Sequence, residues 1–297
     1  MALSSFISCL TPVSALTPQA LPAWQGPGRV DVLRLDQLHP LISGNKAFKL
    51  SGWLERFESG GYQRLLSFGG PWSNHLHALS GLAQSLGLPV TAIVRGYEHL
   101  PLTPTLEDCR DRGMQLVFAS KKDYARRDDP DWQQALAEEY QALVIPEGGQ
   151  GRAGEKGLAA LAPLTEDYDE VWLAAGTGTT ARGLAMHLRP GQTLVAVNAV
   201  ADQGALRRRW QLLDWPCQWR LLDDYHGGGF GRCGPGLLQL IEHCDGEGLP
   251  LDPVYTAKLL AALHGEQQAG RLTHARRLLI HTGGLQGRRG VPGLTHP

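Results

Sequence analysis

Short apolar runs alternate with amphipathic segments along the chain from about residue 64 onward. The run at 64–70 predicts a strand, residues 74–87 predict a helix, and residues 89–96 predict a second strand. Strands separated by helices of this length are joined by right-handed crossovers, which makes the sheet mostly parallel. The pattern therefore predicts an α/β protein.

Helix starts and glycine turns extend the same order further along the chain. Thr103–Pro104 and Asp129–Pro130 each combine an N-cap residue with a proline at the first helical position. After the glycine-rich stretch at 147–157 the alternation resumes, with strands expected at 171–175 and 193–200. Two such sets predict two α/β layers with a cleft between them.

Composition and charge are those of an ordinary soluble globular protein. The chain has 297 residues, 42% of them hydrophobic, which is enough for at least one large core. A formal net charge of -1 provides no general attraction to nucleic acid or anionic lipid, so we expect neither as a partner. The N-terminal segment lacks a basic region and no run is long enough to span a bilayer, so we expect neither a signal peptide nor membrane contact.

Cysteine and histidine spacing argues against a metal site. The five cysteines have no C-x-x-C spacing, which disfavours both a disulfide framework and a thiolate zinc site: Cys9, Cys109, Cys217, Cys233 and Cys244. His75 and His77 are two residues apart on the expected helix and therefore point to different sides. We expect no bound metal, and a reducing cytoplasm as the compartment.

A turn rich in glycine and threonine, Gly176–Thr180, directly follows the strand expected at 171–175 and precedes a helix. Glycines let backbone N–H groups converge at the positive end of a helix, and threonine hydroxyls add donors, so this turn is a candidate phosphate site. It is neither a Walker A loop nor a dinucleotide fingerprint, because no lysine follows the glycines and the G-x-G-x-x-G spacing fails at Ala181. A plain strand-to-helix turn is an equally good interpretation from the residues alone.

Lys46, within "SGNKAFKL" at 43–50, is the second candidate. Most lysines are solvated surface residues, and the segment alone leaves that alternative open. A cofactor that carries both an aldehyde and a phosphate needs one Schiff-base lysine and one phosphate site, and the chain has a candidate for each. Pyridoxal 5'-phosphate is the economical hypothesis.

Several motifs resemble one known family. "SGNKAFKL" resembles the G-G-N-K-x-R-K-L motif of the pyridoxal-phosphate enzymes grouped as 1-aminocyclopropane-1-carboxylate deaminases and D-cysteine desulfhydrases. Further similar segments follow in order along the chain: "WSNH" at 72–75, "AIVRG" at 92–96, "IPEGGQ" at 145–150, "GTGTTARGL" at 176–184, "LDPVYTAKLLAAL" at 251–263 and "IHTGGLQG" at 280–287. The resemblance covers nearly the whole chain from about residue 8.

The resemblance implies a fold and a domain division. The fold would be that of tryptophan synthase β, also called pyridoxal-phosphate fold type II, with mostly parallel sheets in two domains. Residues 1–48 and 151–297 would form the larger, discontinuous domain, and residues 49–150 a smaller inserted one. Family likeness also implies a small amino-acid substrate and a homodimer.

The resemblance assigns roles to residues around the cofactor. Lys46 would hold pyridoxal phosphate as a Schiff base and later move the Cα proton. Ser73 would bind the substrate carboxylate and Asn74 the cofactor's 3'-oxygen, although either residue could simply cap a helix. The phosphate would lie on Gly176, Thr177, Gly178, Thr179 and Thr180.

Two further residues complete the implied site. Thr282 would meet the pyridine nitrogen, where a neutral hydroxyl makes the ring a weaker electron sink than a carboxylate would. Tyr255 would lie over the substrate. The alternatives are a threonine that satisfies a strand end and a half-buried structural tyrosine.

Departures from the family pattern bear on the substrate. The residue after Tyr255 is Thr256, where the deaminases have glutamate. The pair Tyr255–Thr256 resembles the Tyr-Thr of the desulfhydrases. Trp72 replaces a glutamine and Phe230 replaces a tyrosine. We therefore expect β-elimination from a small amino acid such as D-cysteine, giving pyruvate, ammonia and sulfide. The alternatives are ring opening of 1-aminocyclopropane-1-carboxylate to 2-oxobutanoate and ammonia, or a protein that holds the cofactor with little turnover.

Overall fold

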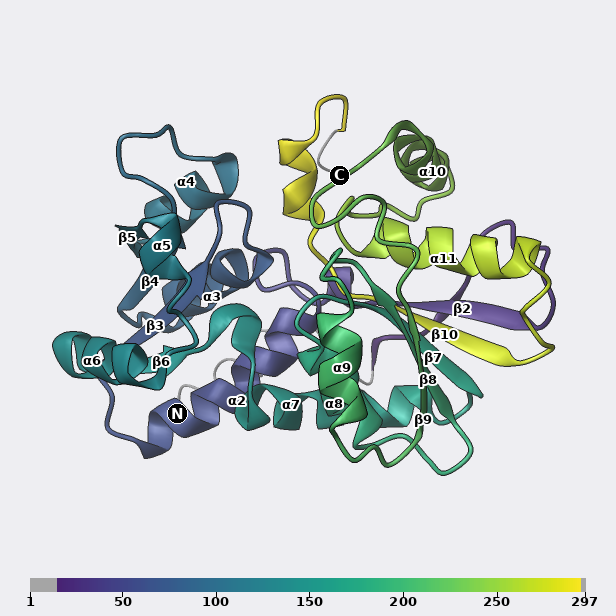
Figure 1. Ribbon diagram of the computed structural model, residues 1–297, viewed down its shortest axis with the longest axis horizontal. Helices are drawn as coiled ribbons and strands as arrows, with labels where there is room; N and C mark the ends of the chain where they lie inside the picture. Colours follow the sequence, from purple (N-terminus) through teal and green to yellow (C-terminus); the bar gives the residue numbers. More distant parts are fainter. Residues whose placement is uncertain (1–14, 295–297) are drawn as a thin grey trace. The chain divides into compact units, whose positions relative to one another are not determined.

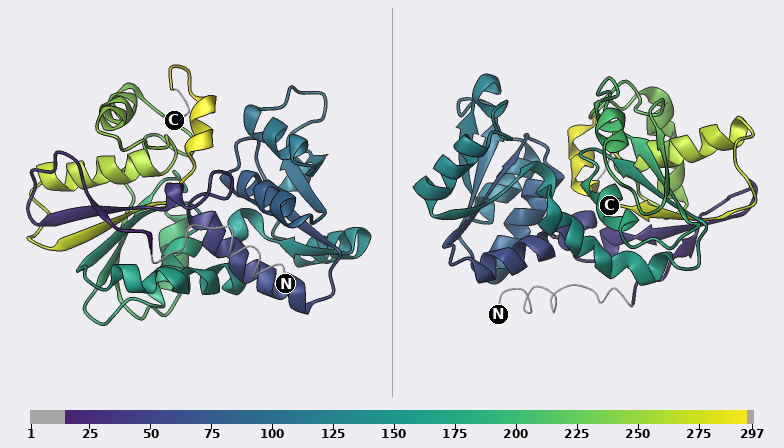
Figure 2. Two further views of the ribbon diagram at one scale, coloured as in Figure 1. Left: turned by 180° about the vertical axis from the view of Figure 1, so that it is seen from behind. Right: turned by 60° about the horizontal axis from the view of Figure 1, so that its bottom comes forward.

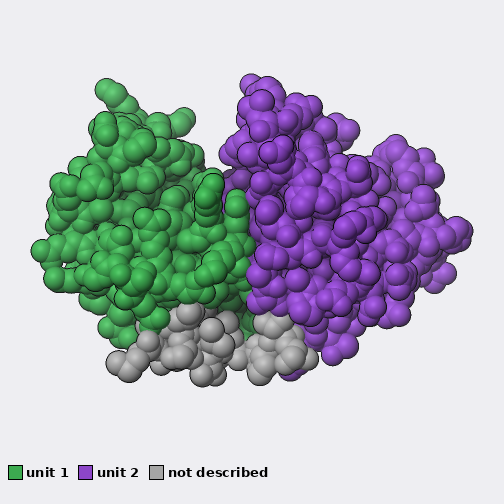
Figure 3. All heavy atoms as spheres, turned by 90° about the horizontal axis from the view of Figure 1, so that it is seen from below, with its two compact units in different colours: residues 1–12, 38–157 green, residues 13–37, 158–297 purple. Residues whose placement is uncertain are grey.

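The chain divides into two compact units in the computed structural model, which describes residues 15–294. Among these residues, unit 1 contains 38–157, and unit 2 contains 15–37 and 158–294 (Figure 3). The division expected from the sequence differs from these units at residues 38–48 and 151–157 and stays a prediction. Cys9 and the start of the N-terminal segment lie outside the described residues.

The sheet of unit 1 is parallel throughout. Within the described residues it has four strands in the order β5-β4-β3-β6 (Figure 1). Their bounds are Arg64–Gly69 for β3, Val90–Arg95 for β4, Gln115–Ala119 for β5 and Ala142–Ile145 for β6. The structure confirms the strands predicted at 64–70 and 89–96, which are β3 and β4.

Three helices of unit 1 begin directly after a residue that caps them through its side chain and that the sequence offers as a cap. Ser73, Thr103 and Asp129 each accept a backbone N–H bond as the N-cap residue of a helix. The helical bounds are Asn45–Ser59 for α2, Asn74–Leu86 for α3, Pro104–Asp111 for α4, Lys121–Tyr124 for α5, Pro130–Tyr140 for α6, Glu147–Gly149 for the 3₁₀ turn η3 and Arg152–Lys156 for α7.

Helices α2 and α7 are packed backbone to backbone. A Cβ at Gly52 would collide with the carbonyl oxygen of Ala153, and one at Gly157 would collide with that of Phe48. Phe48 and its neighbour Leu50 are buried in the same helix. Since core packing leaves no slack, these glycines fix the position of α2 within unit 1.

Unit 2 is built on a second, mostly parallel sheet. Its described strands form one six-stranded sheet in the order β1-β2-β10-β7-β8-β9, in which only the β1 and β2 pair is antiparallel. The bounds are Gln19–Ala20 for β1, Arg29–Arg34 for β2, Glu170–Ala175 for β7, Thr193–Asn198 for β8, Gln218–Leu222 for β9 and Arg276–His281 for β10.

Helices α10 and α11 cover one face of this sheet. Ile241 of α10 and Leu260 of α11 pack with Trp172 and Val195, which belong to neighbouring strands. Figures 1 and 2 show α11 running alongside the strands. The helical bounds of unit 2 are Leu35–Gln37 for η2, Gly157–Thr165 for η4, Thr179–Ala185 for α8, Ala205–Gln211 for α9, Pro235–Gly246 for α10, Thr256–Gln268 for α11 and Leu285–Gly290 for η5.

Several classes of feature are absent from residues 15–294. None of the helices there combines the length and apolar character needed to cross a membrane. No cluster of three or more histidine, cysteine or acidic side chains suitable for a metal ion occurs in this part of the chain. The cysteines among these residues form no disulfide with one another.

Candidate active site

Lys46 is the second residue of α2 and is partly buried in unit 1. Burial lowers the pKa of Lys46 to about 8, while a hydrogen bond with Lys49 acts in the opposite direction. Lys49 lies one turn further along α2 and is almost fully buried. Near neutral pH the neutral form of Lys46 is therefore far more populated than that of an ordinary lysine.

Lys49 was not among the candidates drawn from the sequence. Its Nζ donates to the carbonyl oxygen of Gly148 at 3.2 Å. Burial, followed by the charge and hydrogen bond of Lys46, lowers the pKa of Lys49 well below its ordinary value. Lys49 could have been identified from its position three residues after Lys46, because residues three apart on a helix are neighbours.

His75 lies in the first turn of α3 and is buried. Its Nε2 lies 2.8 Å from Ser67 Oγ, and Ser67 donates to the carbonyl oxygen of Ile145 at 2.7 Å. Because the Ser67 proton is committed, His75 Nε2 is assigned as the donor. Burial, then the nearby Lys46 and Lys49, lowers the pKa of His75, and its Nδ1 has no hydrogen-bond partner among the described residues.

Ser73 and Asn74 begin α3 in the same unit. Ser73 Oγ accepts a hydrogen bond from the N–H of Leu76 at 3.2 Å, as an N-cap residue does. A hydroxyl that accepts through a lone pair keeps its own proton for donation. Capping α3 and donating to an anion are therefore compatible roles for Ser73.

The glycine and threonine turn of unit 2 links β7 to α8. Gly178 is the N-cap residue of α8 with φ 85°, a conformation that favours glycine, and a Cβ there would approach Trp210 Nε1 to 2.8 Å. Thr177 Oγ1 and Thr179 Oγ1 lie 3.1 Å apart, and Arg209 donates to the carbonyl oxygen of Thr177 at 2.7 Å. The turn thus has a fixed backbone with hydroxyl groups at the start of a helix.

Tyr255 lies against this turn. It is the residue before α11, and a Cβ at Gly176 would come within 3.1 Å of the Tyr255 hydroxyl oxygen. The ring of Phe230 meets that of Tyr255 edge to face, with centroids 6.2 Å apart. The structure therefore brings Gly176, Tyr255 and Phe230 together in unit 2.

Thr282 directly follows β10, as expected, and is buried. Strands β10 and β7 pair in parallel, so Thr282 and Gly176 each follow the carboxyl end of one of two neighbouring strands. Carboxyl ends of adjacent parallel strands are where α/β sheets bind ligands.

A buried ion-pair network holds the strand end before Thr282. His281 Nδ1 lies 3.0 Å from Asp36, which also pairs with Arg34, and His281 Nε2 donates to the carbonyl oxygen of Pro250. Burial would raise the pKa of Asp36, but hydrogen bonds from Arg34 and His281 outweigh burial and hold that pKa below its ordinary value. The backbone at Thr282 is thereby fixed.

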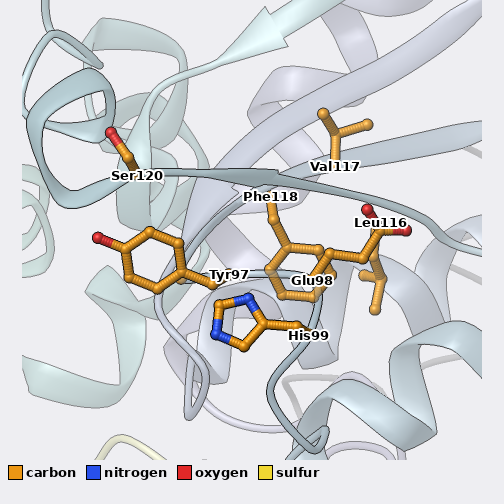
Figure 4. A pocket seen from close by; sticks show the side chains of 8 residues that line it. Tyr97, Glu98, His99, Leu116, Val117, Phe118 and Ser120 are labelled. Carbon is orange, nitrogen blue, oxygen red and sulfur yellow. The ribbon is translucent and has the colours of Figure 1, made fainter.

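A separate cavity of about 350 Å³ lies in unit 1 near the ends of β4 and β5. Tyr97, His99 and Phe118 are among its lining residues (Figure 4). None of the site residues expected from the sequence lines it.

Comparison with known proteins identifies the class. No protein-family model matches the chain. A solved structure described as an ACC deaminase homologue superimposes with a TM-score of 0.73 and 24% identity, covering 95% of each chain. The expected fold is confirmed: the protein has the fold of pyridoxal-phosphate enzymes of fold type II.

Sequence relatives identify the family. A D-cysteine desulfhydrase of Salmonella paratyphi A is 30% identical over 300 residues, covering 87% of this chain and 88% of the relative. A Thermotoga maritima protein with the provisional name 1-aminocyclopropane-1-carboxylate deaminase is 29% identical over 280 residues, covering 86% and 88%. The chain therefore belongs to the D-cysteine desulfhydrase and 1-aminocyclopropane-1-carboxylate deaminase family of pyridoxal-phosphate-dependent lyases and deaminases, as its motifs predicted.

Proposed function

We propose that this protein catalyses β-elimination from a small amino acid of the D-cysteine type, releasing pyruvate, ammonia and sulfide. The observation that carries the proposal is the partly buried amine of Lys46, whose pKa of about 8 suits both attachment of a carbonyl cofactor and proton transfer. Thr256 supports the desulfhydrase assignment, because a family glutamate at that position marks the deaminases. Its hydroxyl is instead hydrogen-bonded to Asp252 at 2.7 Å.

The described residues fit pyridoxal phosphate on two observations. His75 Nδ1 is a buried acceptor without a partner, next to the two amines of α2. The turn at Gly176–Gly178 is closed on its protein side by Tyr255 and Trp210, which leaves its backbone donors for an anion. Lys46, Asn74, Gly176–Thr180 and Thr282 would hold the cofactor.

Each unit contributes its own part of the chemistry. When bound, pyridoxal phosphate supplies a sink for the electron pair left at Cα. In unit 1, Lys46 takes the Cα proton, and Ser73 donates its hydroxyl proton in a hydrogen bond to the substrate carboxylate. In unit 2, Tyr255 and Phe230 provide an aromatic wall, and Thr282 presents a neutral hydroxyl rather than a carboxylate. Side chains that are already held in place need no rearrangement during the reaction, and such groups lower the activation barrier of the chemical step most effectively.

The proposed reaction balances with one water molecule. The Cα–H bond breaks and its electron pair forms the Cα=Cβ bond as the Cβ–S bond breaks, so sulfur leaves with the electrons of that bond and takes a proton. Water then replaces nitrogen at Cα, which gives pyruvate and ammonia. No external oxidant or reductant is needed.

A second candidate is ring opening of 1-aminocyclopropane-1-carboxylate, which the Thermotoga maritima relative favours by its name. Tyr255 and the shared fold fit this reaction as well. Its product is 2-oxobutanoate, so the two candidates are separated by the keto acid formed.

The test incubates the purified protein with D-cysteine, L-cysteine and 1-aminocyclopropane-1-carboxylate and measures keto acid and sulfide. Lys46→Ala is compared with Lys122→Ala, a matched change at an exposed lysine. We expect pyruvate and sulfide from D-cysteine, lost in Lys46→Ala and kept in Lys122→Ala. Release of 2-oxobutanoate instead would establish the second candidate. A protein that binds the cofactor through Lys46 yet releases no keto acid would refute both.

We also propose a homodimer that works in a reducing cytoplasm. Support comes from the family likeness and from the described cysteines, which form no disulfide with one another. Light scattering coupled to size-exclusion chromatography tests the assembly, and a mass of about 32.3 kDa would refute the dimer.

A further inference from the structure

Lys258 is a fully buried lysine in the first turn of α11, and none of the proposed chemical steps uses it. Its Nζ donates to the carbonyl oxygens of Ala199 at 3.0 Å and Gly229 at 2.7 Å. Ala199 directly follows β8, whereas Gly229 lies in the glycine-rich loop, residues 226–234, between β9 and α10 (Figure 1). One amine therefore joins the carboxyl edge of the sheet to this loop.

The carbonyl oxygens around Lys258 Nζ resemble those of a binding site for a small cation. Carbonyl oxygens are the ligands that channels use to hold potassium ions, and a lysine ammonium offers three donors and no acceptor. The nearby carboxylate of Asp252 already accepts hydrogen bonds from the backbone N–H groups of Val254, Tyr255 and Thr256. Burial lowers the pKa of Lys258 to about 8, against the opposing charges of Asp252 and Cys233.

The glycine-rich loop needs such a tether. Gly227, Gly228, Gly229 and Gly231 all have positive φ, between 62° and 124°, so the loop consists largely of backbone that offers few side chains for packing. Phe230 lies in the middle of it, with 53% of its surface exposed and its ring edge against Tyr255. Holding the carbonyl oxygen of Gly229 thus holds the residue next to Phe230.

We propose that Lys258 is a positioning residue whose ammonium group acts as a built-in monovalent cation, binding the carbonyl oxygens of Ala199 and Gly229 and so holding Phe230 against Tyr255. The consequence for substrate binding rests on the proposed function. Without the amine, two buried carbonyl oxygens lose a charged donor, and the loop opens more often. Lys258 touches no reacting atom, so its loss acts on substrate binding through the loop.

The experiment uses the cofactor-loaded protein and the variant Lys258→Met, which keeps an unbranched side chain one atom shorter and removes the amine and its charge. Lys122→Met is the matched control at an exposed position. Deuterium exchange of the peptide spanning residues 226–232 is expected to be about tenfold to a hundredfold faster in Lys258→Met. Its KM for D-cysteine is expected to rise by about tenfold, with a smaller change in kcat.

Added salt separates a cation role from simple packing. Potassium chloride is expected to slow the exchange of residues 226–232 in Lys258→Met and to lower its KM, because potassium can occupy the space between the two carbonyl oxygens. Tetramethylammonium chloride at equal ionic strength has no N–H donor and is too large, so no recovery is expected. The wild-type protein is expected to respond to neither salt.

Three outcomes overturn the proposal. They are unchanged exchange and KM in Lys258→Met, faster exchange that potassium does not slow, or recovery by both salts alike. If Lys258→Met does not fold, Phe230→Ala decides: a raised KM with the Lys46-dependent absorbance intact supports the proposal, and an unchanged KM overturns it. If the wild-type protein makes no pyruvate from D-cysteine, the proposed function fails, whereas the exchange comparison still decides whether Lys258 tethers the loop.

Discussion

The most direct consequence of the site is the titration of Lys46 in the protein freed of cofactor. Its pKa is lowered by burial from the ordinary 10.5 to about 8. At pH 7 an amine with a pKa near 8 is neutral in about one molecule in ten, against about three in ten thousand for an ordinary lysine. Only the neutral amine attacks an aldehyde, so burial gains about 300-fold in reactive amine at that pH.

Trace acetylation followed by peptide mass spectrometry measures this titration. The apoprotein is treated briefly with acetic anhydride between pH 6 and 11, and the extent of modification at Lys46 is compared with that at the exposed Lys122. The quantity of interest is the pH of half-maximal modification, because burial slows access without moving that midpoint. We expect a midpoint near pH 8 for Lys46, about 2.5 units below the value of an unburied lysine.

Lys49 supplies an internal check on the cause. Burial, followed by the charge of Lys46, lowers the pKa of Lys49 well below its ordinary value, and the hydrogen bond with Lys49 raises the pKa of Lys46. Lys49→Met removes this hydrogen bond, so the midpoint of Lys46 is expected to fall further. A Lys46 midpoint near 10.5 in the wild-type protein, or an upward shift in Lys49→Met, would refute the argument from burial.

Three further predictions concern the framework of the site. Gly52→Ala, which forces a Cβ onto a carbonyl oxygen, is expected to lower the free energy of unfolding by about 1–3 kcal/mol. Gly236→Ala, at an exposed helical position, is expected to raise it by up to about 1 kcal/mol. A urea titration in which both variants behave alike would contradict this. Asp36→Asn is expected to cost about 3–5 kcal/mol at pH 7. The folded-state pKa of Asp36 lies below its ordinary 3.8, so the carboxylate stabilises the folded protein fully above about pH 4. The difference in free energy of unfolding between the wild-type protein and Asp36→Asn is therefore expected to shrink as pH falls below about 4. A difference that stays constant from about pH 3 to 7 would contradict the ion-pair network. Ser73→Ala is expected to lose about 1 kcal/mol of stability and to raise KM, whereas Ser73→Gly restores most of the stability and leaves KM high; a low KM in Ser73→Gly would exclude carboxylate binding by the hydroxyl.

Local rules made much of the fold predictable from the sequence. The buried strands of unit 1 are apolar runs bounded by glycine or proline, and Thr103 and Asp129 cap helices as their side chains require. The segment at 29–34 escaped prediction, although it forms β2 beside β10. Its partner lies more than 240 residues away in the chain, and a short strand carries little periodic signal of its own.

The residues of the candidate site also fall into two groups, those that residue type and motif predict and those whose importance depends on tertiary burial. Lys46 and Gly176–Thr180 were proposed because a cofactor with two chemical groups demands two kinds of residue, and the order of the motifs then indicated the family. Lys49 and His75 could not be ranked that way, since their importance lies in burial next to Lys46 rather than in residue type. From the sequence alone a lysine is expected at the surface, and its burial becomes known only with the surrounding backbone.

Three buried lysines in one chain illustrate what decides the role of an amine. Burial lowers the pKa of Lys46 to about 8, and burial together with the charge of Lys46 lowers the pKa of Lys49 well below its ordinary value. Burial also lowers the pKa of Lys258 to about 8, but its Nζ donates to two backbone carbonyl oxygens, at 3.0 and 2.7 Å, and so is committed to holding the backbone. We therefore expect the hydrogen-bond partners of each amine, rather than its pKa, to separate the reacting role proposed for Lys46 from the tethering role proposed for Lys258.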